Sequence, residues 1–198
     1  MTPEPYAAVV LAGGRGARLG GRAKPQLVVG GRTILDAVLA AVADAGQRVV
    51  VGPPQPVTDG VLVVREQPPG GGPVAALRAG LGHVTADVVA VLAGDLPFVT
   101  PGLVAELRSR LTGDGVLVVD DAGRDQLLLG VWRTAPLRAA MPGVAAHVPL
   151  RRVLAPLAVR RFRPPVPDGA PPPWTDCDTP ADLDRARAWV SDRPAGGA

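Results

Sequence analysis

The chain has 198 residues, of which 47% are hydrophobic, and a formal net charge of +3, which is sufficient apolar content for a globular core. Its one cysteine and two histidines are too few for a Cys/His zinc centre or a disulfide framework. Aromatic residues make up only 3% of the chain and 18 carboxylates accompany the 21 basic residues, so we expect no nucleic-acid binding.

The first half of the chain alternates apolar runs with helical patterns, which is typical of βα units around a mostly parallel sheet. We predict strands at residues 7–11, 48–51, 61–64 and 87–93. We predict helices at residues 33–42, 73–79 and 100–111. Pro73 and Pro101 each suit the first turn of a helix. This order of elements predicts an α/β fold.

The second half of the chain is less regular. We predict strands at residues 116–119, 127–132 and 158–162, and short helices at residues 134–141 and 149–154. The proline-rich segment 163–173 is expected to be a surface connector in preference to a peptide-binding site. A last helix is expected after Thr179, its N-cap, with Asp182 in a capping box. We expect one domain over residues 1–190 and a disordered tail over residues 191–198.

A glycine-rich loop over residues 11–24 directly follows the first predicted strand, at the sheet edge where α/β proteins bind ligands. It is not a Walker A loop, because arginine follows Gly21, and Leu19 stands where a dinucleotide-binding loop needs its third glycine. Its glycines let the backbone approach a ligand and aim N–H groups at anionic oxygens. Lys24 is the only lysine of the chain, and its compact charge suits a phosphate, although a biased composition explains one lysine equally well.

The order of residues in this loop resembles the signature of the molybdenum cofactor guanylyltransferases, which are nucleotidyltransferases of the sugar-nucleotide transferase fold. The matching residues are Leu11, Ala12, Gly13, Gly14, Arg18, Gly20 and Lys24. The resemblance implies a three-layer, Rossmann-like α/β/α sandwich with a mostly parallel central sheet. It also implies that the loop, including Leu11, Ala12, Gly13 and Gly14, binds a nucleoside triphosphate. Arg18 and Lys24 would be catalytic residues that neutralise the phosphates.

Asp95 follows the predicted strand of residues 87–93 and precedes Pro97. A carboxylate at the carboxyl end of a buried strand is well placed to hold Mg²⁺ between phosphates, and the alternative is a turn or helix-cap residue. The residues around Asp95 resemble the pattern that holds the metal-binding aspartate of the family. By that resemblance, Asp95 is a catalytic residue that binds both the nucleotide and Mg²⁺.

Residues 65–76 resemble the segment of the family that surrounds the base and ribose. By this resemblance Glu66, Gly72 and Pro73 bind the nucleotide, although Glu66 stands where the family usually has aspartate. Backbone groups of this segment and of Leu11 could read either guanine or cytosine, so the identity of the base stays open.

Residues 174–183 resemble a family segment with two asparagines, and both are replaced here by Asp176 and Asp178. Asp178 would then be the second Mg²⁺ ligand, and Asp176 would support it or face the acceptor. The alternative is that both aspartates cap the last helix. Cys177, between them, is expected to be a small buried filler.

The resemblance implies that GMP is transferred from GTP to the terminal phosphate of molybdopterin, with release of pyrophosphate. No general base is needed, because a phosphate monoester is mostly ionised at pH 7. The basic candidates for holding the acceptor's phosphate include Arg124, Arg133, Arg151 and Arg152, and the favoured alternative for each is a solvated surface charge. The alternatives are a molybdopterin cytidylyltransferase, a guanylyltransferase for a small phospho-acid and a non-catalytic nucleotide-binding module.

No apolar run of the chain approaches the roughly 18 residues that a membrane-spanning helix needs. The opening residues lack the basic and apolar pattern of a secretory signal. We therefore expect a cytoplasmic protein with no membrane contact. Its expected partners are GTP, molybdopterin and other proteins of molybdenum cofactor synthesis.

Overall fold

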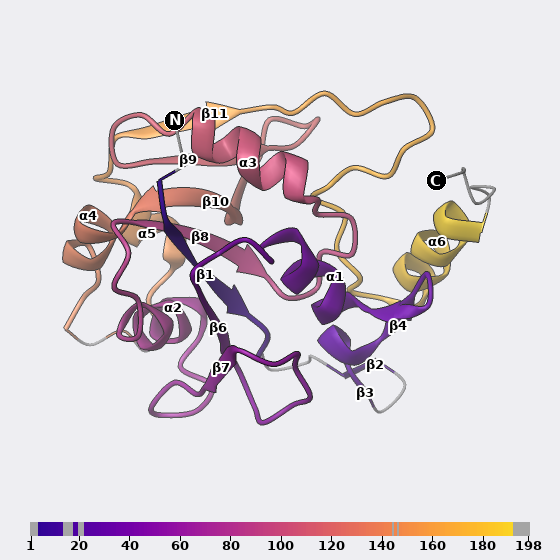
Figure 1. The fold of residues 1–198 in the computed structure, drawn as a ribbon, viewed down its shortest axis with the longest axis horizontal. Helices are drawn as coiled ribbons and strands as arrows, with labels where there is room; N and C mark the ends of the chain where they lie inside the picture. Colours follow the sequence, from indigo (N-terminus) through magenta and orange to yellow (C-terminus); the bar gives the residue numbers. More distant parts are fainter. Residues whose placement is uncertain (1–3, 14–17, 20–21, 144, 146, 192–198) are drawn as a thin grey trace.

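A seven-stranded sheet forms the centre of the computed structural model, which describes residues 4–13, 18–19, 22–143, 145 and 147–191 (Figure 1). Its strand order is β11-β9-β10-β8-β1-β6-β7. The strands are β1 (Tyr6–Leu11), β6 (Gln47–Val51), β7 (Val61–Val64), β8 (Val88–Ala93), β9 (Gly115–Val119), β10 (Asp125–Arg133) and β11 (Val159–Phe162). β10 is antiparallel to both of its neighbours, and every other pair in this sheet is parallel. The predicted, mostly parallel sheet is confirmed.

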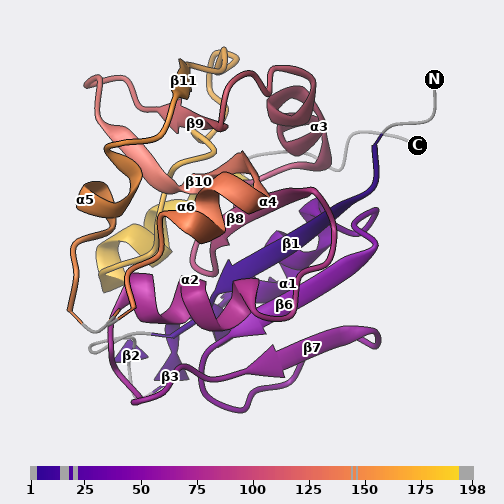
Figure 2. The same ribbon diagram turned by 90° about the vertical axis from the view of Figure 1, so that its left-hand side faces the viewer.

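Helices cover both faces of the sheet. On one face, α1 (Ile34–Ala41) and α3 (Pro101–Ser109) contribute to a core with β1, β8 and β10. On the other face, α2 (Pro73–Leu81), α4 (Thr134–Ala139) and α5 (Leu150–Leu154) form a second core, and these three helices lie in front of the sheet in Figure 2. The structure thus confirms the predicted three-layer α/β/α sandwich. Within the described residues, no helix combines the length and apolar character that a membrane crossing requires.

Short elements beside the sheet were not predicted from the sequence. β2 (Arg18–Leu19) pairs with β3 (Arg22–Ala23), and a 3₁₀ turn, η1 (Lys24–Gln26), follows. β4 (Val28–Val29) then pairs with β5 (Arg32–Thr33), and α6 (Pro180–Ser191) contacts β4 at the right of Figure 1. Two-residue strands have no periodicity that a sequence pattern can reveal.

The longer elements differ from their predicted ranges mainly at the ends. β10 begins two residues early, because Asp125 and Gln126 pair with Val119 and Val118 of β9 despite their polar side chains. Residues 163–179 lie between β11 and α6, and the predicted connector, residues 163–173, is the first part of this segment (Figure 1). α6 ends at Ser191, and the rest of the predicted tail lies outside the described residues.

The registers bring the carboxyl ends of four strands to one edge of the sheet. Leu11 pairs with both Val51 and Ala93, and Val51 pairs with Val64. Because β1, β6, β7 and β8 are mutually parallel, the loops that follow them all leave from this edge, where open α/β sheets bind ligands.

A polar cluster fastens the opposite edge of the sheet, at the start of β1. The Tyr6 hydroxyl donates to Asp44, and Arg108 Nη1 donates to Asp44 Oδ2 at 3.0 Å. The Arg108 guanidinium also lies 3.9 Å from the centre of the Tyr6 ring. Burial raises the pKa of Tyr6, so its hydroxyl stays protonated and keeps donating. The cluster ties β1 to α3 and to the end of α1.

The close approach of α2 to the sheet depends on Gly80. A Cβ at this position would lie 2.5 Å from Val9 Cγ1 and 2.9 Å from Val51 Cγ2. We therefore expect Gly80→Val to lower the free energy of unfolding by about 1–3 kcal/mol through overpacking. Urea unfolding followed by circular dichroism measures this change.

The matched control is Gly102→Val in the first turn of α3. Its Cβ would meet nothing nearer than Thr100 Oγ1 at 3.8 Å, so we expect a change within about 0.5 kcal/mol. Equal stability of the two variants would contradict the packing role of Gly80.

Candidate active site

The backbones of β1, β6 and β8 converge at Ala12, directly after β1. Ala12 N donates to Val51 O at 2.8 Å, and Gly94 N donates to Leu11 O at 2.9 Å. A Cβ on Gly52 would lie 2.7 Å from Ala12 O, and a Cβ on Gly94 would lie 2.9 Å from Ala12 Cβ. Glycine at both positions therefore allows the three strand ends to meet.

The predicted nucleotide loop begins at this convergence. Leu11 and Ala12 are buried, whereas Gly13 is exposed. The predicted contact at Gly14 lies outside the described residues, and the side chain of Arg18 is likewise not described. The described hairpin of β2 and β3 leads the chain to Lys24, at the start of η1.

Lys24 contacts the C-terminal part of the chain. Its Nζ donates to Asp178 Oδ1 at 2.5 Å, across 154 positions of sequence. The Lys24 side chain is 16% exposed and that of Asp178 is 57% exposed, so the lysine is shielded more than its partner. The sequence predicted separate roles for them, in phosphate and metal binding, and did not predict this ion pair.

Asp95 belongs to the same site. Burial raises the pKa of Asp95, and the nearby carboxylates of Asp176 and Asp178 raise it further, whereas its own backbone N–H and Lys24 lower it. Burial, Asp178 and Asp182 likewise raise the pKa of Asp176. The structure therefore gathers the predicted catalytic residues Lys24 and Asp95 with the two predicted C-terminal aspartates.

Cys177 anchors the segment that carries these aspartates. It is fully buried in a small core with Leu27, Ile34, Leu183 and Ala186. Burial raises the pKa of its thiol to about 11. It is a buried filler, as predicted, and its burial fixes the residues on either side of it.

The cap of α6 bears on the capping interpretation of the aspartates, whereas their binding of Mg²⁺ stays a prediction. Thr179 N and Oγ1 each donate to Asp182 Oδ2 at 2.7 Å, and Asp182 N donates to Thr179 Oγ1 at 3.2 Å. The predicted capping box is confirmed. Among the described contacts, the side chains of Asp176 and Asp178 do not cap this helix, so the capping alternative is wrong for them.

Glu66 shapes the second glycine segment. Its Oε1 accepts a hydrogen bond from Gly70 N at 2.8 Å. Gly72 precedes α2 with a φ of 89°, a conformation that favours glycine, and Pro73 occupies the first turn of the helix. The predicted contacts of Glu66, Gly72 and Pro73 with a nucleotide stay predictions, and the structure gives Glu66 a role in fixing its own loop.

Two glutamines near Ala12 were not singled out from the sequence. Gln26 Nε2 donates to Gln55 Oε1 at 3.1 Å, and Gln55 Nε2 lies 3.5 Å from Ala12 O and 3.3 Å from Pro53 O. Gln55 follows β6 at the carboxyl edge of the sheet, and that position is the signal that could have identified it.

Known proteins are similar to the chain in sequence and in fold. The MobA-like NTP transferase domain family matches residues 8–161. The molybdenum cofactor guanylyltransferase of Acidiphilium cryptum is 32% identical over 197 residues, which cover 91% of this chain and 93% of that protein. The probable molybdenum cofactor guanylyltransferase of Mycobacterium tuberculosis is 36% identical over 140 residues, which cover 66% of this chain and 69% of that protein.

Solved structures share the fold. The molybdopterin-guanine dinucleotide biosynthesis protein A of Archaeoglobus fulgidus has a TM-score of 0.70 at 20% identity, with 94% of this chain and 100% of that chain covered. The 2-C-methyl-D-erythritol 4-phosphate cytidylyltransferase of Thermus thermophilus has a TM-score of 0.67 at 22% identity, with 93% of this chain and 98% of that chain covered. With the family match over most of its length, and with Lys24 and Asp95 at one sheet edge, the chain belongs to the MobA-like NTP transferase family.

Proposed function

We propose that the chain is a molybdenum cofactor guanylyltransferase, which transfers GMP from GTP to the terminal phosphate of molybdopterin and releases pyrophosphate. The observation that carries this proposal is the gathering of Lys24, Asp95, Asp176 and Asp178 at the carboxyl edge of the sheet. The names of the sequence relatives support guanine as the base and the molybdenum cofactor as the acceptor.

The nucleotide would occupy the part of the edge formed by β1, β6 and β7. The exposed backbone of Gly13 follows β1, and the loop that Glu66 fixes follows β7. Backbone N–H groups at such strand ends bind anionic oxygens without competing side chains. Lys24, 16% exposed, would exchange its contact with Asp178 for one with the triphosphate.

Among the described side chains of the cluster, carboxylates outnumber ammonium groups, and this excess favours a cation in addition to Lys24. In the part of the chain that the structure describes, three carboxylates face one ammonium group; Asp176 and Asp178 raise the pKa of Asp95 through repulsion, and Asp178 also raises that of Asp176. A triphosphate would add further negative charge. Carboxylate oxygens are the ligands that Mg²⁺ prefers, so the residues present fit this ion.

We propose Asp95 and Asp178 as its protein ligands. The described residues contain no group of three or more acidic, histidine or cysteine side chains that could enclose a metal. This fits an ion held by one or two carboxylates together with the phosphates of the substrate. When bound, Mg²⁺ would offset the charge that develops on the phosphates.

The attacking group would be the terminal phosphate of the acceptor. It is mostly ionised at pH 7, so the protein has no need to remove a proton. Lys24 would stabilise the charge on the transferred phosphate, and the backbone at Ala12, which is bonded to β6, would help to hold the nucleotide for in-line attack. Catalysis would then consist of positioning and charge neutralisation. The cytoplasm as compartment, and contacts with other proteins of cofactor synthesis, stay expectations.

We expect Lys24→Ala and Asp95→Asn each to lower turnover by about two orders of magnitude or more, because the first removes a cation from the transferred phosphate and the second removes a ligand of the proposed Mg²⁺. The measurement is pyrophosphate release with GTP, Mg²⁺ and molybdopterin. Asp184→Asn is the control, since this carboxylate lies on α6 with its side chain 77% exposed. Pyrophosphate release near the wild-type rate in either site variant would contradict the mechanism.

We expect Mg-GTP to bind at least tenfold more tightly than Mg-CTP, because guanine and cytosine present different donors and acceptors to the backbone. Isothermal titration calorimetry measures both affinities. Lys24→Ala should weaken the two nucleotides by a similar factor, since the lysine would contact only phosphate. Tighter binding of Mg-CTP would overturn the choice of guanine.

A further inference from the structure

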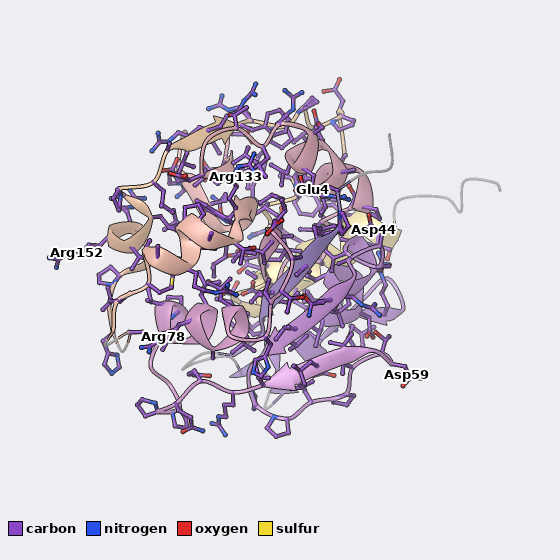
Figure 3. The ribbon with its side chains drawn as sticks, turned by 60° about the vertical axis from the view of Figure 1, so that its left-hand side comes forward. Glu4, Asp44, Asp59, Arg78, Arg133 and Arg152 are labelled. Atoms are coloured by element: carbon purple, nitrogen blue, oxygen red, sulfur yellow. The ribbon has the colours of Figure 1, made fainter. Side chains whose placement is uncertain are left out.

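The structure distinguishes among the four arginines considered for the acceptor. Arg124 follows β9, whose carboxyl end lies at the same edge of the sheet as that of β8. Arg133 ends β10, which runs in the opposite direction, and it pairs with Val88 at the start of β8. Arg151 and Arg152 are exposed on α5, and Arg152 points away from the body of the molecule (Figure 3). Arg124 is therefore the one of the four that follows a strand ending at the site edge.

The turn that carries Arg124 is built around a buried carboxylate. Asp120, directly after β9, is 2% exposed and is the only charged residue among the buried residues of the described chain. Its Oδ1 accepts from the backbone N–H groups of Ala122 and Arg124, each at 2.9 Å. Its Oδ2 accepts from Arg124 Nε at 2.8 Å and from Gln126 Nε2 at 3.1 Å. These hydrogen bonds, above all that of the Arg124 backbone, lower the pKa of Asp120 and keep it ionised.

This arrangement holds Arg124 at its backbone N–H and at its Nε, whereas most of its side chain is exposed. The side chain is 76% exposed, and in the described contacts only its Nε, not its two Nη groups, donates a hydrogen bond. Because Asp120 balances its charge, Arg124 acts as an oriented donor with little net attraction for an anion. A planar guanidinium held in this way suits a flat heteroaromatic ring that carries carbonyl and ring-nitrogen acceptors.

The position of the turn is consistent with the binding of such a ring. β10 separates β9 from β8, so two strand spacings, roughly 10 Å, lie between the strand ends that carry Arg124 and Asp95. The phosphate that reacts would lie at Lys24 and Asp95. The part of the acceptor at Arg124 would then lie at the other end of this distance. The register of β10 shifts between Gln126 and Gly130, beside the turn, and such irregularities redirect side chains next to binding sites.

We propose that Arg124, fixed by buried Asp120, binds the heteroaromatic ring of the acceptor on the β9 side of Asp95 and thereby sets the affinity for the acceptor. The inference rests on the nucleotidyl transfer proposed above, and it adds the place where the unreactive end of the acceptor is held.

The test compares Arg124→Gln with the wild-type chain by equilibrium binding of molybdopterin, measured without turnover, and by the KM for molybdopterin. We expect the affinity to fall and the KM to rise about tenfold, with the Kd of Mg-GTP unchanged within a factor of two. Arg133→Gln, the same change at the opposite edge of the sheet, should leave both unchanged. Arg124→Lys should recover little of the affinity for molybdopterin that Arg124→Gln loses, because an ammonium group lacks the planar fork of a guanidinium.

An affinity for molybdopterin within twofold of wild type in Arg124→Gln would overturn the inference. An equal loss of Mg-GTP affinity would also overturn it, because it would place Arg124 on the nucleotide. Asp120→Asn is the second variant, and an unchanged thermal unfolding temperature would show that it keeps the fold. Like Arg124→Gln, it should weaken the binding of molybdopterin. If the wild-type chain binds molybdopterin but transfers no nucleotide to it, the proposed function fails, and the binding comparison still decides the role of Arg124.

Discussion

The site depends on how closely three strand ends can approach one another. At Ala12 the backbone is in contact with Gly52 on one side and Gly94 on the other, and a Cβ at either glycine would overlap Ala12. This approach places Ala12, directly after β1, against Gly94, the residue that precedes Asp95. A parallel sheet provides the common edge, and the small residues allow its loops to act on one ligand.

A second constraint is the charge balance at that edge. Among the described side chains, one ammonium group faces three carboxylates, and Asp178 takes the direct contact with Lys24. The pair connects parts of the chain that are 154 positions apart, and it is held in place by the buried Cys177. A phosphate ligand, as proposed, would therefore meet a cation that is already positioned, and the excess of described carboxylates is what supports the proposed Mg²⁺.

The strand order divides the edge into two halves on either side of Asp95. β1, β6 and β7 are followed by glycine-containing segments of the proposed nucleotide site, and the loop at Glu66 is fixed by its own side chain. β10 and β9 supply the other half, where Asp120 makes the turn rigid. The Tyr6, Asp44 and Arg108 cluster lies at the far edge and holds the scaffold together. The Tyr6 cluster is thus separated from the site edge by the length of β1.

The sequence by itself determined whatever depends on local pattern. Apolar runs predicted the strands, prolines predicted helix starts, and Thr179 with Asp182 predicted a cap that the structure contains. Only the tertiary structure decided that Asp178 pairs with Lys24, that Glu66 binds its own loop and that Asp120 is buried beneath Arg124. The strands, helix starts and cap arise from neighbours along the chain, whose spacing is visible in sequence. The Lys24–Asp178 pair and the burial of Asp120 arise from residues that meet only when the sheet forms, and Glu66 bonds its loop through a side-chain contact that has no periodic signal.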